Sequence, residues 1–188
     1  MPFIDTDIAG VFVFEPQVYS DDRGYFFESF NATHFLDKEM DVNFVQDNQS
    51  HSRYGVLRGL HYQLNPFAQA KLVRVVQGEV LDVAVDLRAG SPTYGKHVSL
   101  VISAENKKQL YIPRGFAHGF VVLSETADFL YKCDNYYSKE QDGGIIYNDP
   151  ELHIDWQIPE KDIILSEKDA ALPALKDAKH NFSMHHNL

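Results

Sequence analysis

Residues 80–87 read VLDVAVDL, and the fold class follows from this stretch. Leu81, Val83, Val85 and Leu87 fall on one side of an extended chain, because successive strand residues point to opposite faces. Asp82 and Asp86 fall on the other side. Valine in a two-residue alternation is typical of a β-strand. The stretch therefore predicts a strand over residues 80–87.

Similar short runs recur on both sides of this strand, with turns predicted between them at Asp22-Arg23-Gly24, Gln77-Gly78 and Gly90-Ser91-Pro92. Helical patterns are confined to residues 31–40 and to a short stretch that begins at Ser166. Eight to ten strands with few helices predict an all-β sandwich or closed barrel that can hold one small ligand. The other predicted strands cover residues 11–18, 24–30, 44–50, 56–63, 71–76, 98–103, 109–112, 119–123 and 127–135.

Length and composition limit the classes of protein to which the chain can belong. The 188 residues fit a single domain, 1–188, with the barrel core at about 44–150. The net charge of −10 argues against a nucleic-acid partner, although a few arginines could still bind a small phosphorylated ligand. A single cysteine, Cys133, excludes internal disulfides and Cys-based zinc sites. With neither a signal peptide nor a membrane span in view, we expect a cytoplasmic protein with no membrane partner.

Three of the predicted strands carry polar residues among apolar ones. In the first, residues 55–63 (GVLRGLHYQ), alternation predicts that His61 and Gln63 share one face and that Arg58 lies on the other. In the second, residues 70–76 (AKLVRVV), Lys71 shares a face with valines. The third, residues 129–133 (FLYKC), places a tyrosine between apolar neighbours. Polar side chains that point into a barrel are candidates for binding and catalysis.

Two spacings involve glycine and histidine: Gly55 is followed six residues later by His61, and residues 113–118 (PRGFAH) end at His118. These spacings resemble the signatures of the cupin barrel, in which metal-binding members usually place a ligand at the position of His118. Such cupins also need a second histidine two residues after the first and a glutamate shortly beyond it, but this chain has Gln63 and no glutamate there. A buried Lys71 would also repel a divalent cation. We therefore expect neither a metal nor another cofactor, with a metal-dependent cupin enzyme as an alternative.

Eight segments narrow the match within the cupins. They are residues 22–26 (DRGYF), 46–50 (QDNQS), 57–63 (LRGLHYQ), 71–75 (KLVRV), 82–88 (DVAVDLR), 113–120 (PRGFAHGF), 148–150 (NDP) and 165–169 (LSEKD). With these segments the chain resembles the dTDP-4-dehydrorhamnose 3,5-epimerase family, in order from about residue 5 to residue 175. The resemblance implies a cupin-type jelly-roll barrel with an N-terminal strand extension and short C-terminal helices. It also implies a homodimer in which N-terminal strands are candidates for exchange between subunits.

The reaction implied by the resemblance inverts carbons 3 and 5 of dTDP-4-dehydro-6-deoxy-D-glucose to give dTDP-4-dehydro-L-rhamnose. Inverting a carbon next to a ketone needs a base, an acid on the opposite face, and a group that stabilises the enolate between the two steps. By resemblance His61 is the base, Asp169 its carboxylate partner and Tyr131 the acid. Lys71 could offset the negative charge that develops on the sugar's carbonyl oxygen.

The same resemblance assigns residues that bind the dTDP-sugar. Arginine suits the diphosphate because its planar fork can bind two phosphate oxygens at once. The family also has an acidic contact about five residues after a tyrosine that stacks on thymine, and either Asp142 or Glu140 could supply it. The binding residues implied are Arg23 and Arg58 for the diphosphate, Glu28, Gln46 and Asn48 for the nucleoside, Tyr137 for thymine, and His118, Asp142 and Lys168 as further ligand contacts.

Each of these residues also has a structural interpretation. His61 alone would more often be a satisfied core histidine, Lys71 could protect an edge strand, and Asp169 could belong to a helix-capping box with Ser166. Tyr131 and Tyr137 could be ordinary barrel aromatics, and Arg23 a solvated turn residue. Their joint occurrence favours an enzyme. The alternatives in function are an epimerase of one carbon, a sugar-nucleotide ketoisomerase, and a binding module without turnover.

Overall fold

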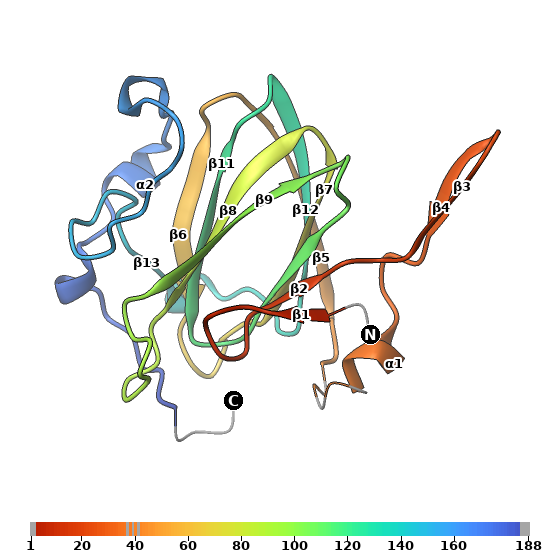
Figure 1. Cartoon of the computed structure of the whole chain (residues 1–188). Helices are drawn as coiled ribbons and strands as arrows, with labels where there is room; N and C mark the ends of the chain where they lie inside the picture. The colour runs from red at the N-terminus through yellow and green to blue at the C-terminus, as the bar shows by residue number, and fades with distance from the viewer. Residues whose placement is uncertain (1–2, 37, 39, 41, 185–188) are drawn as a thin grey trace.

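Antiparallel β-strands are the main regular secondary structure of the computed structural model, which describes residues 3–36, 38, 40 and 42–184 (Figure 1). The first sheet has six strands in the order β1-β2-β10-β7-β12-β5, so the N-terminal strands extend one side of the barrel. These strands are β1 (Phe3–Asp5), β2 (Phe12–Phe14), β5 (Gln46–Arg53), β7 (Lys71–Gln77), β10 (Gln109–Ile112) and β12 (Thr126–Cys133).

The second sheet has five strands in the order β13-β6-β11-β8-β9 and faces the first. Its strand β8 corresponds to the alternating stretch at residues 80–87, shifted by one residue. The predicted all-β barrel is therefore confirmed. The strands are β6 (Leu57–Gln63), β8 (Glu79–Asp86), β9 (His97–Ser103), β11 (Phe116–Val122) and β13 (Asp142–Gly144).

The main core fills the space between the two sheets. Val73 and Val75 of β7 face Ala84 of β8 and Phe120 of β11, and all four are buried. β8 is buried on both faces. Its side chains Leu81, Val83 and Val85, with Leu87 just after the strand, point outward and pack under the segment that follows β13. That second cluster includes Ile145, Leu152, Trp156, Leu175 and Phe182, which cover the outside of the second sheet.

Short helices lie outside the barrel. α1 (Ala32–Leu36) and α2 (Glu167–Ala170) are the two α-helices of the described part of the chain, and α2 begins after Ser166 as predicted. The helix expected over residues 31–40 ends at Leu36, and residues 37 and 39 lie outside the described ones. Across the described residues, no helix has the length and apolar content required to cross a membrane. The described residues also form three 3-10 helices: η1 (Lys139–Gln141), η2 (Glu160–Asp162) and η3 (Leu175–Asp177).

An aromatic cluster fixes α1 and the start of β5 against the first sheet. Phe35 of α1 is 1% exposed and contacts the rings of Phe3, Phe14, Phe30 and Phe44. Burial of one phenylalanine side chain contributes about 1.5–3 kcal/mol. Because Phe14 precedes and Phe30 follows residues 18–27, the cluster anchors both ends of the hairpin that these residues form.

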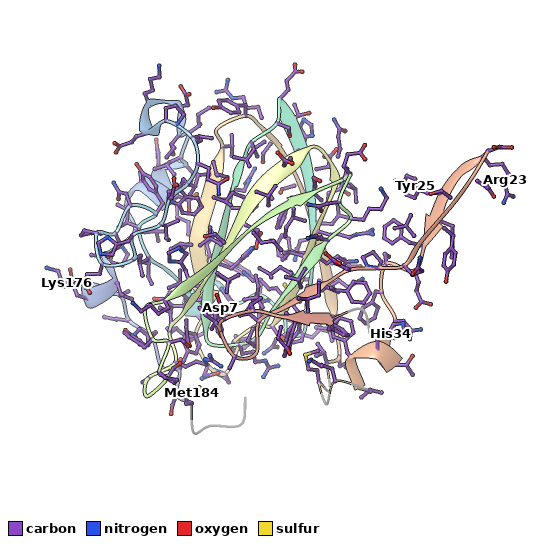
Figure 2. All side chains as sticks on the ribbon, in the orientation of Figure 1. Asp7, Arg23, Tyr25, His34, Lys176 and Met184 are labelled. Atoms are coloured by element: carbon purple, nitrogen blue, oxygen red, sulfur yellow. The ribbon has the colours of Figure 1, made fainter. Side chains whose placement is uncertain are left out.

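That element is a hairpin of β3 (Val18–Asp21) and β4 (Gly24–Phe27), called the arm below. The arm extends away from the barrel, and Arg23 lies at its far end (Figure 2). Tyr25 and Phe26 are 62% and 69% exposed, which is unusual for large aromatic side chains. The strand predicted over residues 11–18 is divided between β2 and β3, because Pro16 has no N–H to donate to a sheet.

Candidate functional site

A cavity of about 480 Å³ opens between the two sheets, within the range of small-molecule sites. The apolar side chains of Phe120 and Phe129 form one wall and stack with their ring centres 4.1 Å apart. The polar lining comes from β5, β6, β7, β11, β12 and α2, so the complete fold is needed to assemble it. The polar residues of the lining are Gln49, Ser50, Arg58, His61, Lys71, His118, Tyr131, Ser166, Lys168 and Asp169.

His61 of β6 forms an ion-pair contact with Asp169 of α2. Nε2 of His61 lies 2.5 Å from Oδ1 of Asp169, although the two residues are 108 positions apart in the chain. Burial acts to raise the pKa of Asp169, but hydrogen bonds from His61 and Ser166 outweigh it and hold the pKa below the usual value. Asp169 is therefore ionised and can only accept, so Nε2 carries the proton and Nδ1 of His61 is free to act as a base.

The contacts of Asp169 combine the two interpretations of this residue. Ser166 caps α2, with its Oγ accepting from the backbone N–H of Asp169 at 3.1 Å. The Asp169 side chain itself points to His61 and to the Ser166 hydroxyl. A helix cap is present, but it is Ser166 that provides it.

Lys71 begins β7, which lies between β10 and β12 in the middle of the first sheet. The interpretation of Lys71 as an edge-strand lysine is therefore wrong. The prediction that Lys71 shares a face with Val73 and Val75 is confirmed, since those valines belong to the inner core and Lys71 lines the cavity. Burial lowers the pKa of Lys71, while Cys133, Asp82 and Asp142 oppose this effect. A cation at this position can stabilise negative charge that forms inside the cavity.

Tyr131 of β12 lines the cavity beside Lys71. The Lys71 ammonium lies 5.8 Å from the centre of the Tyr131 ring. Burial raises the pKa of the Tyr131 hydroxyl. This phenol therefore keeps its proton at neutral pH and can donate it to a nearby carbanion.

His118 of β11 contributes a second buried histidine–carboxylate pair. Its Nε2 lies 2.9 Å from Oδ2 of Asp82, and Asp82 is fully buried. Burial lowers the pKa of His118, although Asp82 opposes the shift. Among the described residues, no group of three or more His, Cys, Asp or Glu side chains is arranged to hold a metal ion.

Arg58 lies on the same side of β6 as His61, which corrects the alternation-based prediction. The β6–β11 pairing shifts register between the pairs His118–His61 and Phe120–Arg58, so both side chains line the cavity. Gly59 lies at the shift with a φ of +132°, and a Cβ there would be 2.5 Å from the Cα of Gly119. A glycine inside a strand is the sequence signal of such a bulge.

An adjoining cavity of about 330 Å³ shares His61, Lys71, Tyr131 and Lys168 with the first. Here the side chain of Asp142 contacts Lys168, and its Oδ2 accepts from the Tyr137 hydroxyl at 3.3 Å. Glu140 instead accepts from Ser138. Of the two acidic residues, Asp142 is therefore the one in the cavity. The predicted residues that line this second cavity are Gln46, Asn48, Tyr137, Asp142 and Lys168.

Arg23 and Glu28 lie away from these cavities. The Arg23 side chain is 89% exposed at the tip of the arm and pairs with Asp21 at 2.5 Å (Figure 2). Glu28, at the base of the arm, contacts His34 at 3.2 Å. The structure therefore brings together the predicted residues of the barrel and of α2, but not the two residues of the arm.

Gln49 and Ser50 line the cavity although they were not predicted to belong to the site, and two further unpredicted polar residues contact predicted ones. Asp82 orients His118, and the signal for it was an acidic residue inside the apolar run of residues 80–87. Ser166 contacts Asp169, and the sequence had marked it only as the start of a helix. Both act through another side chain, and such contacts depend on distances that a linear pattern does not contain.

The comparison with known families agrees with this geometry. The sequence profile described as dTDP-4-dehydrorhamnose 3,5-epimerase matches residues 5–177, which is most of the chain. The chain belongs to this family. The cupin-type fold and the enzyme class predicted from the sequence are thereby confirmed.

Relatives in the dTDP-4-dehydrorhamnose 3,5-epimerase family cover nearly the whole chain. The Shigella flexneri enzyme of that name is 56% identical over 170 residues, which are 90% of this chain and 93% of the relative. A crystal structure of the enzyme from Elizabethkingia anophelis is 56% identical, with a TM-score of 0.89 over 93% of this chain and 96% of that one. A structure from Legionella pneumophila in complex with dTDP-4-keto-L-rhamnose is 52% identical, with a TM-score of 0.89 over 93% and 92%.

Proposed function

We propose that this chain is a dTDP-4-dehydrorhamnose 3,5-epimerase that converts dTDP-4-dehydro-6-deoxy-D-glucose to dTDP-4-dehydro-L-rhamnose. The observation that carries the proposal is the His61–Asp169 pair, which faces the same cavity as Lys71 and Tyr131. The Shigella flexneri relative, at 56% identity, is named dTDP-4-dehydrorhamnose 3,5-epimerase, and the Legionella pneumophila 3,5-epimerase, at 52% identity, was crystallised with dTDP-4-keto-L-rhamnose. A base, a cation and a phenol around one cavity are the groups that this reaction requires.

In the proposed mechanism, Nδ1 of His61 removes the proton from the carbon next to the C4 ketone. The electron pair moves onto the ketone oxygen, and Lys71 stabilises the resulting enolate. Asp169 stabilises the imidazolium that forms at His61. The enolate then collapses, and its carbon takes a proton from Tyr131 on the opposite face. His61 then releases its proton to solvent and the Tyr131 phenolate takes one up, which restores both groups. The same steps at the second carbon complete the conversion, and no electron is transferred to or from a cofactor.

The two adjoining cavities suggest how the dTDP portion binds. Arg58 supports a diphosphate because its guanidinium lines the main cavity near His61. The Tyr137 ring, 54% exposed at the edge of the second cavity, offers a face for thymine. Gln46, Asn48, Asp142 and Lys168 provide hydrogen-bonding groups for the nucleoside, and His118 provides one near the sugar.

We further propose that the enzyme is a homodimer in which the arm of one subunit reaches the other. Tyr19, Tyr25 and Phe26 expose large apolar areas that a partner surface would cover. Arg23 pairs with Asp21 and Glu28 with His34, and within the described part of the chain none of these four residues lines either cavity. Arg23 and Glu28 could therefore contribute to dTDP binding only if the arm is placed against another site.

The remaining parts of the proposal concern the chain as a whole. We propose that residues 1–188 work as one epimerase domain with a barrel core at about 44–150. Its setting would be the cytoplasm, where it would supply a nucleotide sugar for surface polysaccharide. The main cavity is lined by residues from β5 at one end of the sequence range to α2 at the other. These elements must pack together to form the cavity, which supports a single functional unit.

The deciding experiment incubates the purified enzyme with dTDP-4-dehydro-6-deoxyglucose in D₂O and follows the sugar by NMR. Deuterium at both carbon 3 and carbon 5 is the expected result, in the presence or absence of a chelator. Exchange at one carbon would instead identify a single-carbon epimerase. Loss of exchange with chelator would identify a metal-dependent enzyme. Binding of the nucleotide sugar without exchange would leave a binding module.

Subunit mixing tests the role of the arm. Chains with His61→Ala have a disabled base but an intact arm, and chains with Arg23→Ala have the reverse. At a substrate concentration well below KM, a mixed dimer should be more active than the mean of the two parent dimers, because the Arg23→Ala subunit's intact base receives the other subunit's intact arm. Activity equal to the mean would show that each arm serves its own chain. Sedimentation measurements on the mixture would verify that mixed dimers form.

A further inference from the structure

α2 is a four-residue helix that carries Asp169 to the active site. One helical turn has little stability of its own, so other contacts must hold it in place. The preceding segment is bonded to the start of β6, with the Leu57 N–H donating to Ile164 O at 2.9 Å and the Ile164 N–H donating to Gly55 O at 2.8 Å. These bonds fix the backbone position of α2, but they do not set the direction of the Asp169 carboxylate.

Ser166 supplies the contact that sets this direction. Its Oγ accepts from the Asp169 N–H at 3.1 Å and donates its proton to Oδ2 of Asp169 at 2.8 Å. The other carboxylate oxygen, Oδ1, accepts from His61. Because Asp169 is 4% exposed, water cannot easily replace either partner. The carboxylate is thus held at both oxygens, and the rotation that would move Oδ1 away from His61 is blocked.

We propose that Ser166 is a positioning residue for the epimerisation, acting through Asp169 on His61. The inference rests on the proposed function of the cavity. The Ser166 hydroxyl keeps Oδ1 of Asp169 in line with Nε2 of His61. The imidazole therefore keeps its proton on Nε2, and its unprotonated Nδ1 can act as the base. When His61 becomes positively charged, the same alignment places the negative charge beside it without rearrangement.

A role as helix cap alone makes a different prediction for one particular substitution. Glycine is nearly as good as serine at an N-cap, whereas alanine destabilises the helix. Ser166→Gly therefore keeps α2 and removes the hydroxyl, Ser166→Ala removes both, and Ser166→Thr keeps both. If Ser166 only caps α2, the glycine variant should behave as the wild type.

The experiment compares these three variants by the rate of deuterium incorporation, thermal unfolding and the NMR signal of the His61 Nε2 proton. We expect kcat to fall about tenfold in both Ser166→Gly and Ser166→Ala, with KM within twofold, and Ser166→Thr to recover most of kcat. Only Ser166→Ala should lower Tm clearly. The His61 proton signal should shift in the two variants without a hydroxyl.

Asp155→Ala is the matched control, because Asp155 also binds a nearby backbone N–H, that of Gln157 at 2.9 Å, but lies outside the site. Its kcat should be unchanged. Wild-type kcat and an unshifted His61 signal in Ser166→Gly would overturn the proposal, as would a change in KM alone, which would make Ser166 a substrate contact. If the wild type itself exchanges no deuterium, the proposed function fails, while the His61 signal still tests the positioning role.

Discussion

The cavity and the arm differ in how far their functional side chains are buried and in which contacts hold them in place. In the cavity, Asp169 and His118 are buried and bonded to partners from distant strands or helices. On the arm, Arg23 is 89% exposed and pairs with Asp21, two residues away in the same hairpin. Packing within one chain positions the first group, whereas only an added surface or ligand could position the second.

This difference suits the cavity to proton transfer and the arm to substrate binding. Proton transfer needs groups held within a fraction of an ångström, which a rigid barrel can supply. Contacts with a charged diphosphate tolerate looser geometry, because the long aliphatic part of an arginine side chain can bend to bring its planar guanidinium to the phosphate. Variants in the cavity should therefore change kcat, and variants on the arm should change KM.

The largest effect is expected from His61→Ala. Without its base, the enzyme should lose two to four powers of ten in deuterium exchange at both carbons, the range typical of general base catalysis. Binding of dTDP should remain within about threefold, as measured by calorimetry. His51→Ala is the matched control, because His51 also pairs with an aspartate, Asp128 at 2.9 Å, but on the exposed surface of β5. Near-normal exchange in His61→Ala would exclude it as the base.

The next effect should come from Tyr131→Phe, at about one hundredfold in kcat. The ring that contacts Lys71 stays in place, and only the proton donor is lost. Proton removal should be less affected than product formation, so deuterium exchange into the substrate should continue while inversion slows. Tyr111→Phe, on β10 and outside both cavities, serves as the control. Equal loss of exchange and inversion would contradict a role of Tyr131 limited to proton return.

A pH profile sharpens the comparison further. Burial lowers the pKa of Lys71 and raises that of Tyr131, so Lys71 loses its proton first as the pH rises. Activity should therefore fall on the alkaline side as the positive charge in the cavity disappears. Lys71→Arg should be slower at neutral pH but lose less activity at high pH, since arginine stays charged. Lys176→Arg, remote on η3, should leave the profile unchanged. An identical alkaline limb in Lys71→Arg would assign that limb to another group.

Sequence reasoning predicted the barrel because alternation is a local property. β10 was predicted with its observed ends, and β7 and β8 to within one residue. Contacts between distant segments came only from the family resemblance, since no local pattern places Asp169 beside residue 61. The face of Arg58 was predicted wrongly because one register shift at Gly59 reverses the alternation beyond it.

The arm shows a second limit of the sequence. The turn at residues 22–24 was predicted as a turn and is one, but its projection from the barrel has no counterpart in hydrophobic alternation. Exposed aromatics such as Tyr25 and Phe26 resemble core residues in a linear pattern. Only the three-dimensional structure shows that other side chains fill the core and leave these two aromatic residues exposed.

The smallest effect is expected from Arg23→Ala. One charge-assisted contact to a phosphate is worth about 1.4 kcal/mol, so KM should rise about tenfold while kcat stays within twofold. Because the contact would be electrostatic and solvent-exposed, the difference between variant and wild type should shrink as salt concentration rises. Lys176→Ala removes the same charge from the opposite side of the molecule and should leave KM unchanged (Figure 2). An unchanged KM in Arg23→Ala would leave the arm with a role in assembly alone, whereas a large loss of kcat would mean that the arm, like the cavity, holds the reacting sugar in place.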